Sequence, residues 1–203
     1  MIYDFLLVAA LREESKGRFE TLKRPVIYTG VGKLNAAISL FSNLHFLLTE
    51  KTKIPKVVLN LGTAVSATKE IGKVFQVNRF IQRDMRCEPI APKYITPFEF
   101  DAFPFLDIQK FSNRFENVTC GTGDSFLSNF NSIQNAFSAD YDIADMEGYA
   151  LAKVCKRLGI PFLSLKYISD LGDAEQWKES LEKASIALSV SASLLIKDLK
   201  KLC

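Results

Sequence analysis

Short, uninterrupted runs of apolar residues alternate along the chain with longer segments in which apolar residues recur every three or four positions. Runs of this kind are typical of strands that are buried on both faces, as in a mostly parallel sheet. Four segments have this form: YDFLLVAA (3–10), PVIYTG (25–30), KVVLNLG (56–62) and PFLSLKYIS (161–169).

The segments between these runs have the periodicity of amphipathic helices. In 33–48 the apolar stripe predicts a buried face made of Leu34, Ala37, Ile38, Phe41, His45 and Leu48, which makes the one histidine a core residue. In 148–158 the stripe consists of Leu151, Val154, Cys155 and Leu158, and Gly159 and Pro161 end the helix. From about 174 to the end, a long helix is marked by Trp177, Leu181, Ala184, Leu188, Leu195 and Leu202.

Alternating buried strands and helices indicate an α/β fold in which helices cover both faces of a central sheet. The chain has 203 residues, 48% of them hydrophobic, and no internal repeat or low-complexity run divides it. We therefore predict a single domain over 1–203, with a twisted, mostly parallel or mixed sheet flanked by helices.

Composition narrows the class of protein. The net charge of +3 is small and basic residues are mixed with acidic ones, so nucleic acid is not expected as a partner. No apolar stretch reaches the length of a membrane span. Four cysteines without CxxC spacing, one histidine and a start without signal-peptide features favour a cytoplasmic protein without a metal site. The glycine-containing segments GVGKLN (30–35) and GTGDSF (121–126) do not complete a dinucleotide-binding or P-loop motif, so no cofactor is expected.

Polar residues follow the predicted strands at their carboxyl ends, where ligands bind in open α/β sheets. Glu13 and Glu14 follow the first strand, Thr63 the third and Asp170 the fourth. Glu147 lies four positions before Leu151, in phase with the buried stripe of its helix. Because a buried carboxylate without a partner costs several kcal/mol, a ligand that offers hydroxyl groups is indicated there.

The segment DMEGYALAKVCKRLGIPFLSLKYISD (145–170) resembles the C-terminal signature of the nucleoside phosphorylase/nucleosidase superfamily, and looks most like its methylthioadenosine/S-adenosylhomocysteine nucleosidases. Four further segments resemble family motifs in the same order: VAALREE (8–14), TGVGKLNAA (29–37), VVLNLGTA (57–64) and GTGDSFL (121–127). The resemblance extends from residue 1 to about 173. It implies the nucleoside phosphorylase fold and a purine nucleoside as the small-molecule substrate.

The resemblance also implies two catalytic residues. Asp170 matches the aspartate that protonates the purine at N7, and Ser169 would orient it. The chemistry needs a carboxylic acid with a raised pKa, which burial at the end of an apolar strand can provide. Glu14 matches the glutamate that activates water as the nucleophile.

The substrate-binding residues follow in the same way. Glu147 matches the glutamate that accepts hydrogen bonds from the ribose 2′- and 3′-hydroxyls, and Met146 would pack on the ribose. Phe126 matches the aromatic residue that stacks on the purine, and Leu127 the residue whose backbone contacts the edge of the base. Thr63, which follows Gly62 at the end of the third predicted strand, is a further candidate for substrate contact.

Residues 84–118 are irregular and contain several prolines, which is typical of a functional or interfacial loop. In the nucleosidases the corresponding segment closes over the 5′-substituent, from the partner subunit of a homodimer. The stretch FEFDAFP (98–104) resembles the aromatic part of that segment. The candidates for an apolar 5′ pocket are Met85, Phe98, Phe103 and Pro104.

The sequence favours hydrolysis over phosphorolysis, because it lacks the GDP-x-R loop and the arginine with which related phosphorylases bind phosphate. Arg12, Arg79 and Arg83 leave a phosphate-dependent phosphorylase as an alternative. A non-catalytic nucleoside-binding protein is a second alternative, of another class. The prediction is a purine nucleosidase that acts on a 5′-modified adenosine, such as methylthioadenosine or S-adenosylhomocysteine, and releases the base.

Overall fold

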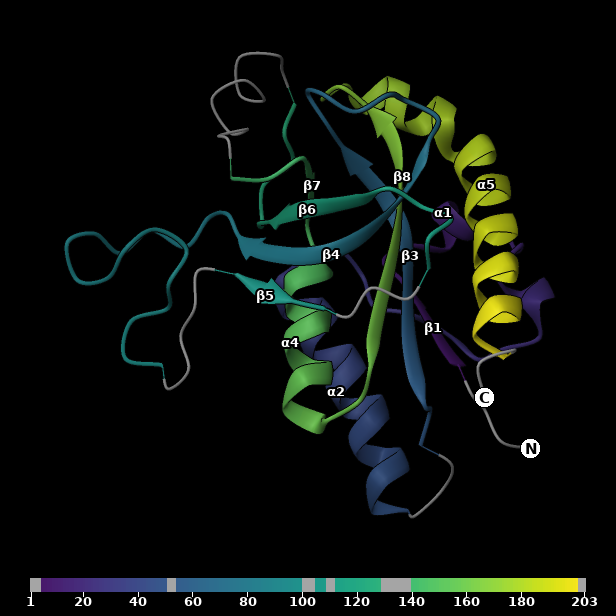
Figure 1. The fold of residues 1–203 in the computed structure, drawn as a ribbon, viewed down its shortest axis with the longest axis horizontal. Coiled ribbons are helices and arrows are strands. Elements are labelled where there is room, and N and C mark those ends of the chain that lie inside the picture. Colours follow the sequence, from purple (N-terminus) through teal and green to yellow (C-terminus); the bar gives the residue numbers. More distant parts are fainter. Residues whose placement is uncertain (1–4, 51–53, 100–104, 109–111, 129–139, 201–203) are drawn as a thin grey trace.

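The computed structural model describes residues 5–50, 54–99, 105–108, 112–128 and 140–200 (Figure 1). The strands are β1 (Phe5–Ala9), β2 (Val26–Tyr28), β3 (Val57–Val65), β4 (Val74–Gln82), β5 (Leu106–Asp107), β6 (Asn117–Thr122), β7 (Ile143–Asp145) and β8 (Phe162–Asp170). The helices are α1 (Arg12–Ser15), a 3-10 turn η1 (Glu20–Leu22), α2 (Lys33–Thr49), α4 (Gly148–Leu158) and α5 (Ala174–Lys200).

All eight strands of the described residues belong to one mixed sheet. β1 pairs in parallel with both β2 and β3, and β3 pairs in parallel with β8. β8 pairs antiparallel with β4, β4 pairs in parallel with β6, and β6 with β7. A short antiparallel contact between β7 and β3 completes a ring of five strands. The predicted α/β fold with a mixed, mostly parallel sheet is confirmed.

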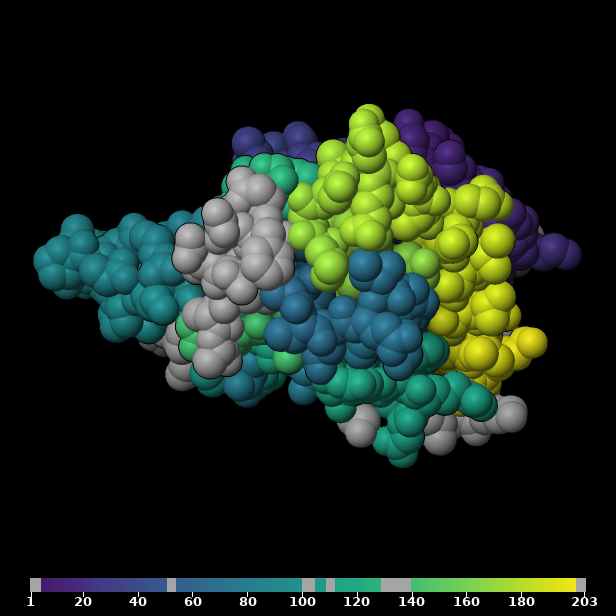
Figure 2. All heavy atoms as spheres, turned by 90° about the horizontal axis from the view of Figure 1, so that it is seen from above, coloured from purple at the N-terminus to yellow at the C-terminus, as the bar shows by residue number. Residues whose placement is uncertain are grey.

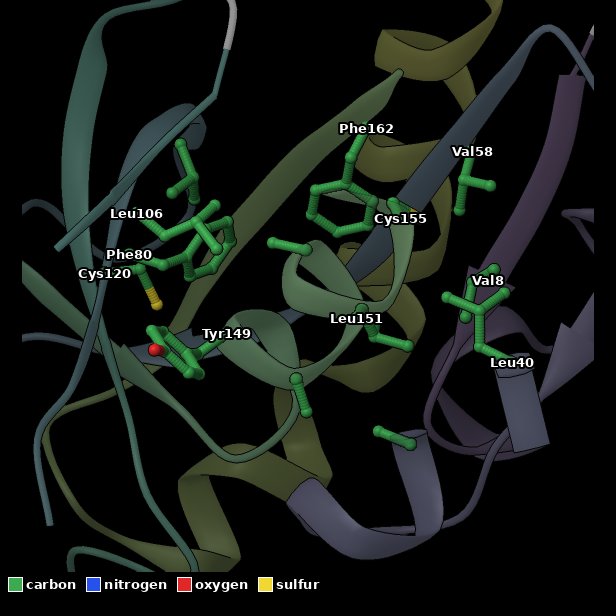
Figure 3. Close-up of a cluster of buried hydrophobic side chains, with 14 of the residues drawn as sticks. Val8, Leu40, Val58, Phe80, Leu106, Cys120, Tyr149, Leu151, Cys155 and Phe162 are labelled. Atoms are coloured by element: carbon green, nitrogen blue, oxygen red, sulfur yellow. The ribbon is translucent and has the colours of Figure 1, made fainter. Parts of the chain in front are cut away.

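Helices cover both faces of this sheet. α2 and α4 pack against each other on one face, and α5 covers the other along β8 (Figure 1). Each face has its own apolar core: Figure 3 shows the α2–α4 side, where Leu40, Leu151 and Phe162 meet. On the α5 side, Leu188 and Leu195 pack against β1, β3 and β8. The predicted stripes of α4 and α5 are therefore confirmed for the described residues; Leu202 lies outside them.

The predicted buried face of α2 is largely wrong, although Ala37 is partly buried against the core. The residues that point into the core are Ala36, Leu40 and Leu44, whereas Leu34 is 70% exposed and Ile38 57% exposed. His45 is also exposed and stacks on the ring of Phe41 at 5.5 Å, so it is not a core histidine. The helix carries apolar residues on two faces, and for such a helix periodicity alone does not identify the face that packs on the sheet.

The segment that follows β4 leaves the body of the domain. Residues 85–99 form a loop that extends to one side in two views at right angles (Figures 1 and 2). Phe98 lies on this loop and is 97% exposed. Among the described residues, no helix combines the length and the apolar character that crossing a membrane requires.

Candidate functional site

A cavity of about 190 Å³ opens at the carboxyl ends of β1, β3, β7 and β8, where the strand pattern predicts a ligand. Its lining joins segments that are far apart in the chain: the turn after β1, the ends of β3 and β8, residues 144–147 and the loop 125–127. Most of the predicted site residues lie in this lining: Glu14, Thr63, Phe126, Leu127, Met146, Glu147, Ser169 and Asp170.

Asp170 is the last residue of β8, and its carboxyl group is buried. The Ser169 hydroxyl donates to Oδ2 at 2.6 Å, as the sequence predicts for an orienting residue, and the Gly172 N–H donates to Oδ1 at 2.8 Å. Burial raises the pKa of Asp170, and these two hydrogen bonds oppose the rise without cancelling it. Asp170 therefore has the raised pKa that a general acid needs.

Glu14 is buried in the short helix α1, and its neighbour Glu13 is exposed. Oε1 accepts hydrogen bonds from the backbone N–H and the hydroxyl of Thr63, both at 2.8 Å. The hydroxyl of Thr63 accepts in turn from the indole N–H of Trp177 at 3.0 Å. This chain of hydrogen bonds fixes the carboxyl group of Glu14 at the wall of the cavity.

Glu147 occupies the N-cap position of α4 and is 8% exposed. Its Oε1 accepts a 2.8 Å hydrogen bond from the backbone N–H of Gly32, where α2 begins. Burial, together with the nearby carboxylate of Asp145, raises the pKa of Glu147 to about 8, although Lys166 and the Gly32 N–H act in the opposite direction. The buried carboxyl group thus has one backbone partner and retains free lone pairs towards the cavity.

The sequence analysis missed a buried ion pair beneath these carboxylates. Lys166 of β8 places Nζ 2.8 Å from Oδ2 of Asp145, and the two side chains are 2% and 1% exposed. Asp145 also accepts from the hydroxyl of Thr122 and from the backbone N–H of Gly148. Although burial acts to lower it, the pKa of Lys166 is raised by these acidic neighbours. The sequence feature that could have indicated this ion pair is the lysine within the apolar run PFLSLKYIS.

Gly62 of β3 leaves space for the side chains of Lys166 and Glu14. A Cβ at this position would lie 3.2 Å from Nζ of Lys166 and 3.4 Å from Oε1 of Glu14. Either contact is tight, so a larger residue would push the lysine or the glutamate away. Gly62 therefore allows Lys166 and Glu14 to pack closely beside the cavity.

Two of the four candidates for the apolar 5′ pocket, Met85 and Phe98, belong to the described residues. Neither is among the residues that line the cavity, and Phe98 is 97% exposed. Phe103 and Pro104 lie outside the described residues.

The three arginines that left a phosphorylase as an alternative, Arg12, Arg79 and Arg83, lie in different environments. Arg12 is exposed and pairs with Glu20. Arg79 pairs with Asp107 on β5 and does not line the cavity. Arg83 lines the cavity, but its terminal nitrogens donate to the loop at Gly123 and Ser125. In the described parts of the chain, no group of three or more His, Cys, Asp or Glu residues is arranged to hold a metal ion.

Comparison with known proteins agrees with this geometry. The family model described as the phosphorylase superfamily matches residues 11–199. A 5′-methylthioadenosine/S-adenosylhomocysteine nucleosidase of Staphylococcus aureus is 30% identical, over 87% of this chain and 83% of the relative. The nucleosidase of the same name from Staphylococcus epidermidis is 27% identical, over 84% of this chain and 80% of its own.

The fold is also that of solved structures. The crystal structure of the Helicobacter pylori 5′-methylthioadenosine/S-adenosylhomocysteine nucleosidase with butyl-thio-DADMe-Immucillin-A has a TM-score of 0.82 at 19% identity, covering 98% of this chain and 99% of that one. With nearly its whole length matched by the family model, the chain belongs to the phosphorylase superfamily.

Proposed function

We propose that the protein is a cofactor-free purine nucleosidase that hydrolyses the N-glycosidic bond of a 5′-modified adenosine, such as methylthioadenosine or S-adenosylhomocysteine. The observation that carries the proposal is one cavity whose lining brings together the buried carboxyl groups of Glu14, Glu147 and Asp170 and the aromatic ring of Phe126. The fourth buried carboxyl group of this lining, of Asp145, is paired with Lys166. The two staphylococcal relatives, which bear the names of these two substrates, support the choice of nucleoside.

The reaction divides the carboxyl groups into three roles. Asp170 donates its proton to N7 of the purine while the C1′–N9 bond breaks, so that the base leaves as a neutral molecule. Glu14 accepts a proton from the water whose oxygen bonds to C1′. Glu147 accepts hydrogen bonds from the ribose hydroxyls, and negative charge on it stabilises the oxocarbenium-like transition state. The products are the free base and a ribose derivative with a hydroxyl at C1′.

The environment of each carboxyl group supports its role. A raised pKa keeps a proton available on Asp170. The two hydrogen bonds from Thr63 hold Oε1 of Glu14 in place at the cavity wall, which suits a group that orients and activates water. Phe126 is 47% exposed in the cavity wall, so a flat base has an aromatic surface on which to stack.

Water is favoured over phosphate as the nucleophile. A phosphate dianion needs cationic or N–H donors that are free to bind it. Among the described residues that line the cavity, the one arginine is Arg83, and its terminal nitrogens already donate to loop oxygens. Lys166 is paired with Asp145. Apart from Arg83, the ionisable side chains of this lining are carboxyl groups, which offer an anion no positive charge.

A homodimer is part of the proposal. Leu34, Ile38 and Phe41 on the outward face of α2, and Val31 just before the helix, are 40–70% exposed, and Val31 also lines the cavity. An apolar surface that continues from the rim of a ligand site is typical of a subunit interface. In such a dimer the loop 85–99 of one subunit, with Met85 and Phe98, would supply the apolar surface for the 5′-substituent bound by the other.

For the setting of the reaction, we propose purine salvage in a reducing cytoplasm. The thiols of Cys87, Cys120 and Cys155 are free, which suits that compartment.

The test is base release from a panel of purine nucleosides, measured with and without phosphate. The proposal expects adenine from methylthioadenosine or S-adenosylhomocysteine in phosphate-free buffer. Release that requires phosphate would replace it with a phosphorylase, and tight binding of the nucleosides without base release would replace it with a non-catalytic binding protein.

A further inference from the structure

Arg83, the first residue after β4, has a buried guanidinium group in the lining of the cavity that the proposed reaction does not use. The residue is 9% exposed, and among the described residues it has no carboxylate partner. Burying a full charge without an ion pair is costly, and a side chain needed only to fill space would be apolar. The contacts of this group therefore indicate a specific task.

All hydrogen bonds of the guanidinium go to one short segment of chain. Nη1 donates to the hydroxyl of Ser125 at 3.0 Å, and Nη2 donates to the backbone oxygen of Gly123 at 3.1 Å. Nη2 also donates to the backbone oxygen of Ser125. A planar group with several fixed donors suits such a task, because one side chain ties down two residues of a loop at once.

Gly123 lies directly against the guanidinium plane. A Cβ at this position would lie 2.9 Å from Cζ of Arg83 and 3.0 Å from Nε. Nε is enclosed and has no hydrogen-bond partner in the described part of the chain, so this edge of the group does not face the cavity. Arg83 thus contacts the loop rather than offering a free donor to a ligand.

The next residue acts on the same loop. The carboxylate of Asp84 accepts from the backbone N–H of Asp124 at 2.8 Å and from Nζ of Lys33 at 2.6 Å. Asp124 accepts in turn from the backbone N–H of Lys33 at 2.7 Å, where α2 begins. Residues 123–125 are therefore held from both sides, and they lead directly into Phe126 and Leu127, which line the cavity.

We propose that Arg83 is a positioning residue for recognition of the base: by fixing the carbonyls of Gly123 and Ser125, it sets the ring of Phe126 and the backbone of Leu127 against the purine. This inference rests on the proposed function, since it takes the purine to be the group that these residues contact. Arg83 acts through the loop and does not touch the substrate.

The test is a double-mutant cycle between Arg83→Met and Phe126→Ala, with KM and kcat for methylthioadenosine and the Kd for adenine as readouts. Methionine keeps the apolar stem and removes the donors. We expect Arg83→Met to raise KM and the adenine Kd by on the order of tenfold, the effect of losing one or two charged hydrogen bonds that order the binding surface. The change in kcat should be smaller, because Asp170 and Glu14 are untouched.

In the Phe126→Ala background the same Arg83 substitution should change KM by less than about threefold, since the two residues act as one unit. Arg83→Lys keeps the charge without the planar set of donors and should restore only part of the affinity. Arg157→Met is the control: Arg157 is an exposed arginine of α4 that does not line the cavity, and its loss should leave all three constants unchanged.

Gly123→Ala tests the same contact from the loop side, should Arg83→Met not fold. The added methyl group would displace the guanidinium without changing Arg83, and a similar rise in KM is expected.

Wild-type-like KM and adenine Kd in Arg83→Met would overturn the inference. A tenfold effect that persists in the Phe126→Ala background would also overturn it, by indicating that Arg83 acts on the substrate directly. If the wild-type protein neither binds adenine nor releases it from any purine nucleoside, the proposed function is wrong and the inference fails with it.

Discussion

The backbone N–H of Gly32 donates a 2.8 Å hydrogen bond to the carboxyl group of Glu147, across 115 positions of sequence. The contact joins the start of α2 to the start of α4 at the wall of the cavity. It gives the buried carboxyl group one partner from the protein itself. Burial nevertheless keeps the pKa of Glu147 high, at about 8, so the group is largely protonated in the empty site at neutral pH.

This pKa predicts how stability depends on pH. In the unfolded chain the carboxyl group titrates near 4.5, and in the folded protein near 8. Between these values the folded state holds a proton that the unfolded state has lost, so the free energy of unfolding falls as pH rises from about 4.5 to 8. Glu147→Gln removes this dependence, and its stability relative to the wild type should rise by on the order of 4 kcal/mol between pH 5 and pH 8.5.

Urea unfolding at a series of pH values measures that difference, with Glu13→Gln as an exposed control of the same chemistry. An equal stability change at pH 5 and pH 8.5 would refute the assignment. The same substitution should lower kcat/KM by about 100-fold, since an amide, unlike the carboxyl group, cannot lose a proton when the ribose binds and so cannot stabilise the developing positive charge. Stability and activity should therefore change in opposite directions.

The role of Asp170 predicts a loss of rate without a loss of fold. Asp170→Asn keeps the shape of the side chain but removes the proton that the base needs, so kcat for methylthioadenosine should fall by about 100- to 10,000-fold. Asp173→Asn is the control, because Asp173 is an exposed acid three residues away that accepts from the backbone at the start of α5, and asparagine caps helices equally well. Near wild-type turnover by Asp170→Asn would remove this residue from the mechanism.

The pair of Lys166 and Asp145 predicts a stability effect that a second substitution reverses. Lys166→Met leaves the carboxylate of Asp145 buried without its cation and should lower the free energy of unfolding by about 3 kcal/mol. Adding Asp145→Asn removes the unpaired charge and should recover most of the loss. Thermal and urea unfolding of the two single variants and the double variant measure this coupling. Additive losses would contradict it.

The proposed subunit interface predicts that charge on the outward face of α2 separates the subunits. Ile38→Glu places a carboxylate in the centre of the exposed apolar face, and sedimentation at micromolar concentration should then show monomers. Asn43→Glu changes the same helix on another exposed side and should leave the dimer intact. A wild-type protein that sediments as a monomer would exclude this dimer outright.

Much of the fold can be predicted from the sequence, because four strands are short segments made mainly of apolar residues, and α4 and α5 each have one apolar stripe. β4, β6 and β7 are harder to find. β4 is broken by Gln76, Asn78 and Arg79, and β7 has only three residues. These strands gain their stability from pairing with distant partners, which a local pattern does not report.

Some residues of the site could likewise be predicted from the sequence, and others could not. Asp170, Glu14 and Glu147 were predicted because they follow strands or lie in phase with a buried stripe and because they match family motifs; the match to VAALREE alone chose Glu14 over Glu13. Lys166 was missed inside an apolar run, and Trp177 was counted as a helix residue although its indole N–H reaches Thr63 in the cavity wall. Arg83 was considered only as a phosphate ligand. The tasks of these three residues depend on tertiary contacts, which have no periodicity in the sequence.

The central claim is that water is the nucleophile, and its oxygen can be followed directly. Methylthioadenosine is converted in phosphate-free buffer made with ¹⁸O-labelled water, and the sugar product is analysed by mass spectrometry at once, before the label exchanges. Hydrolysis at the cavity of Glu14 and Asp170 predicts one ¹⁸O atom in methylthioribose, at C1, with a rate that added phosphate does not change. Turnover that appears only with phosphate and yields methylthioribose 1-phosphate would contradict the account.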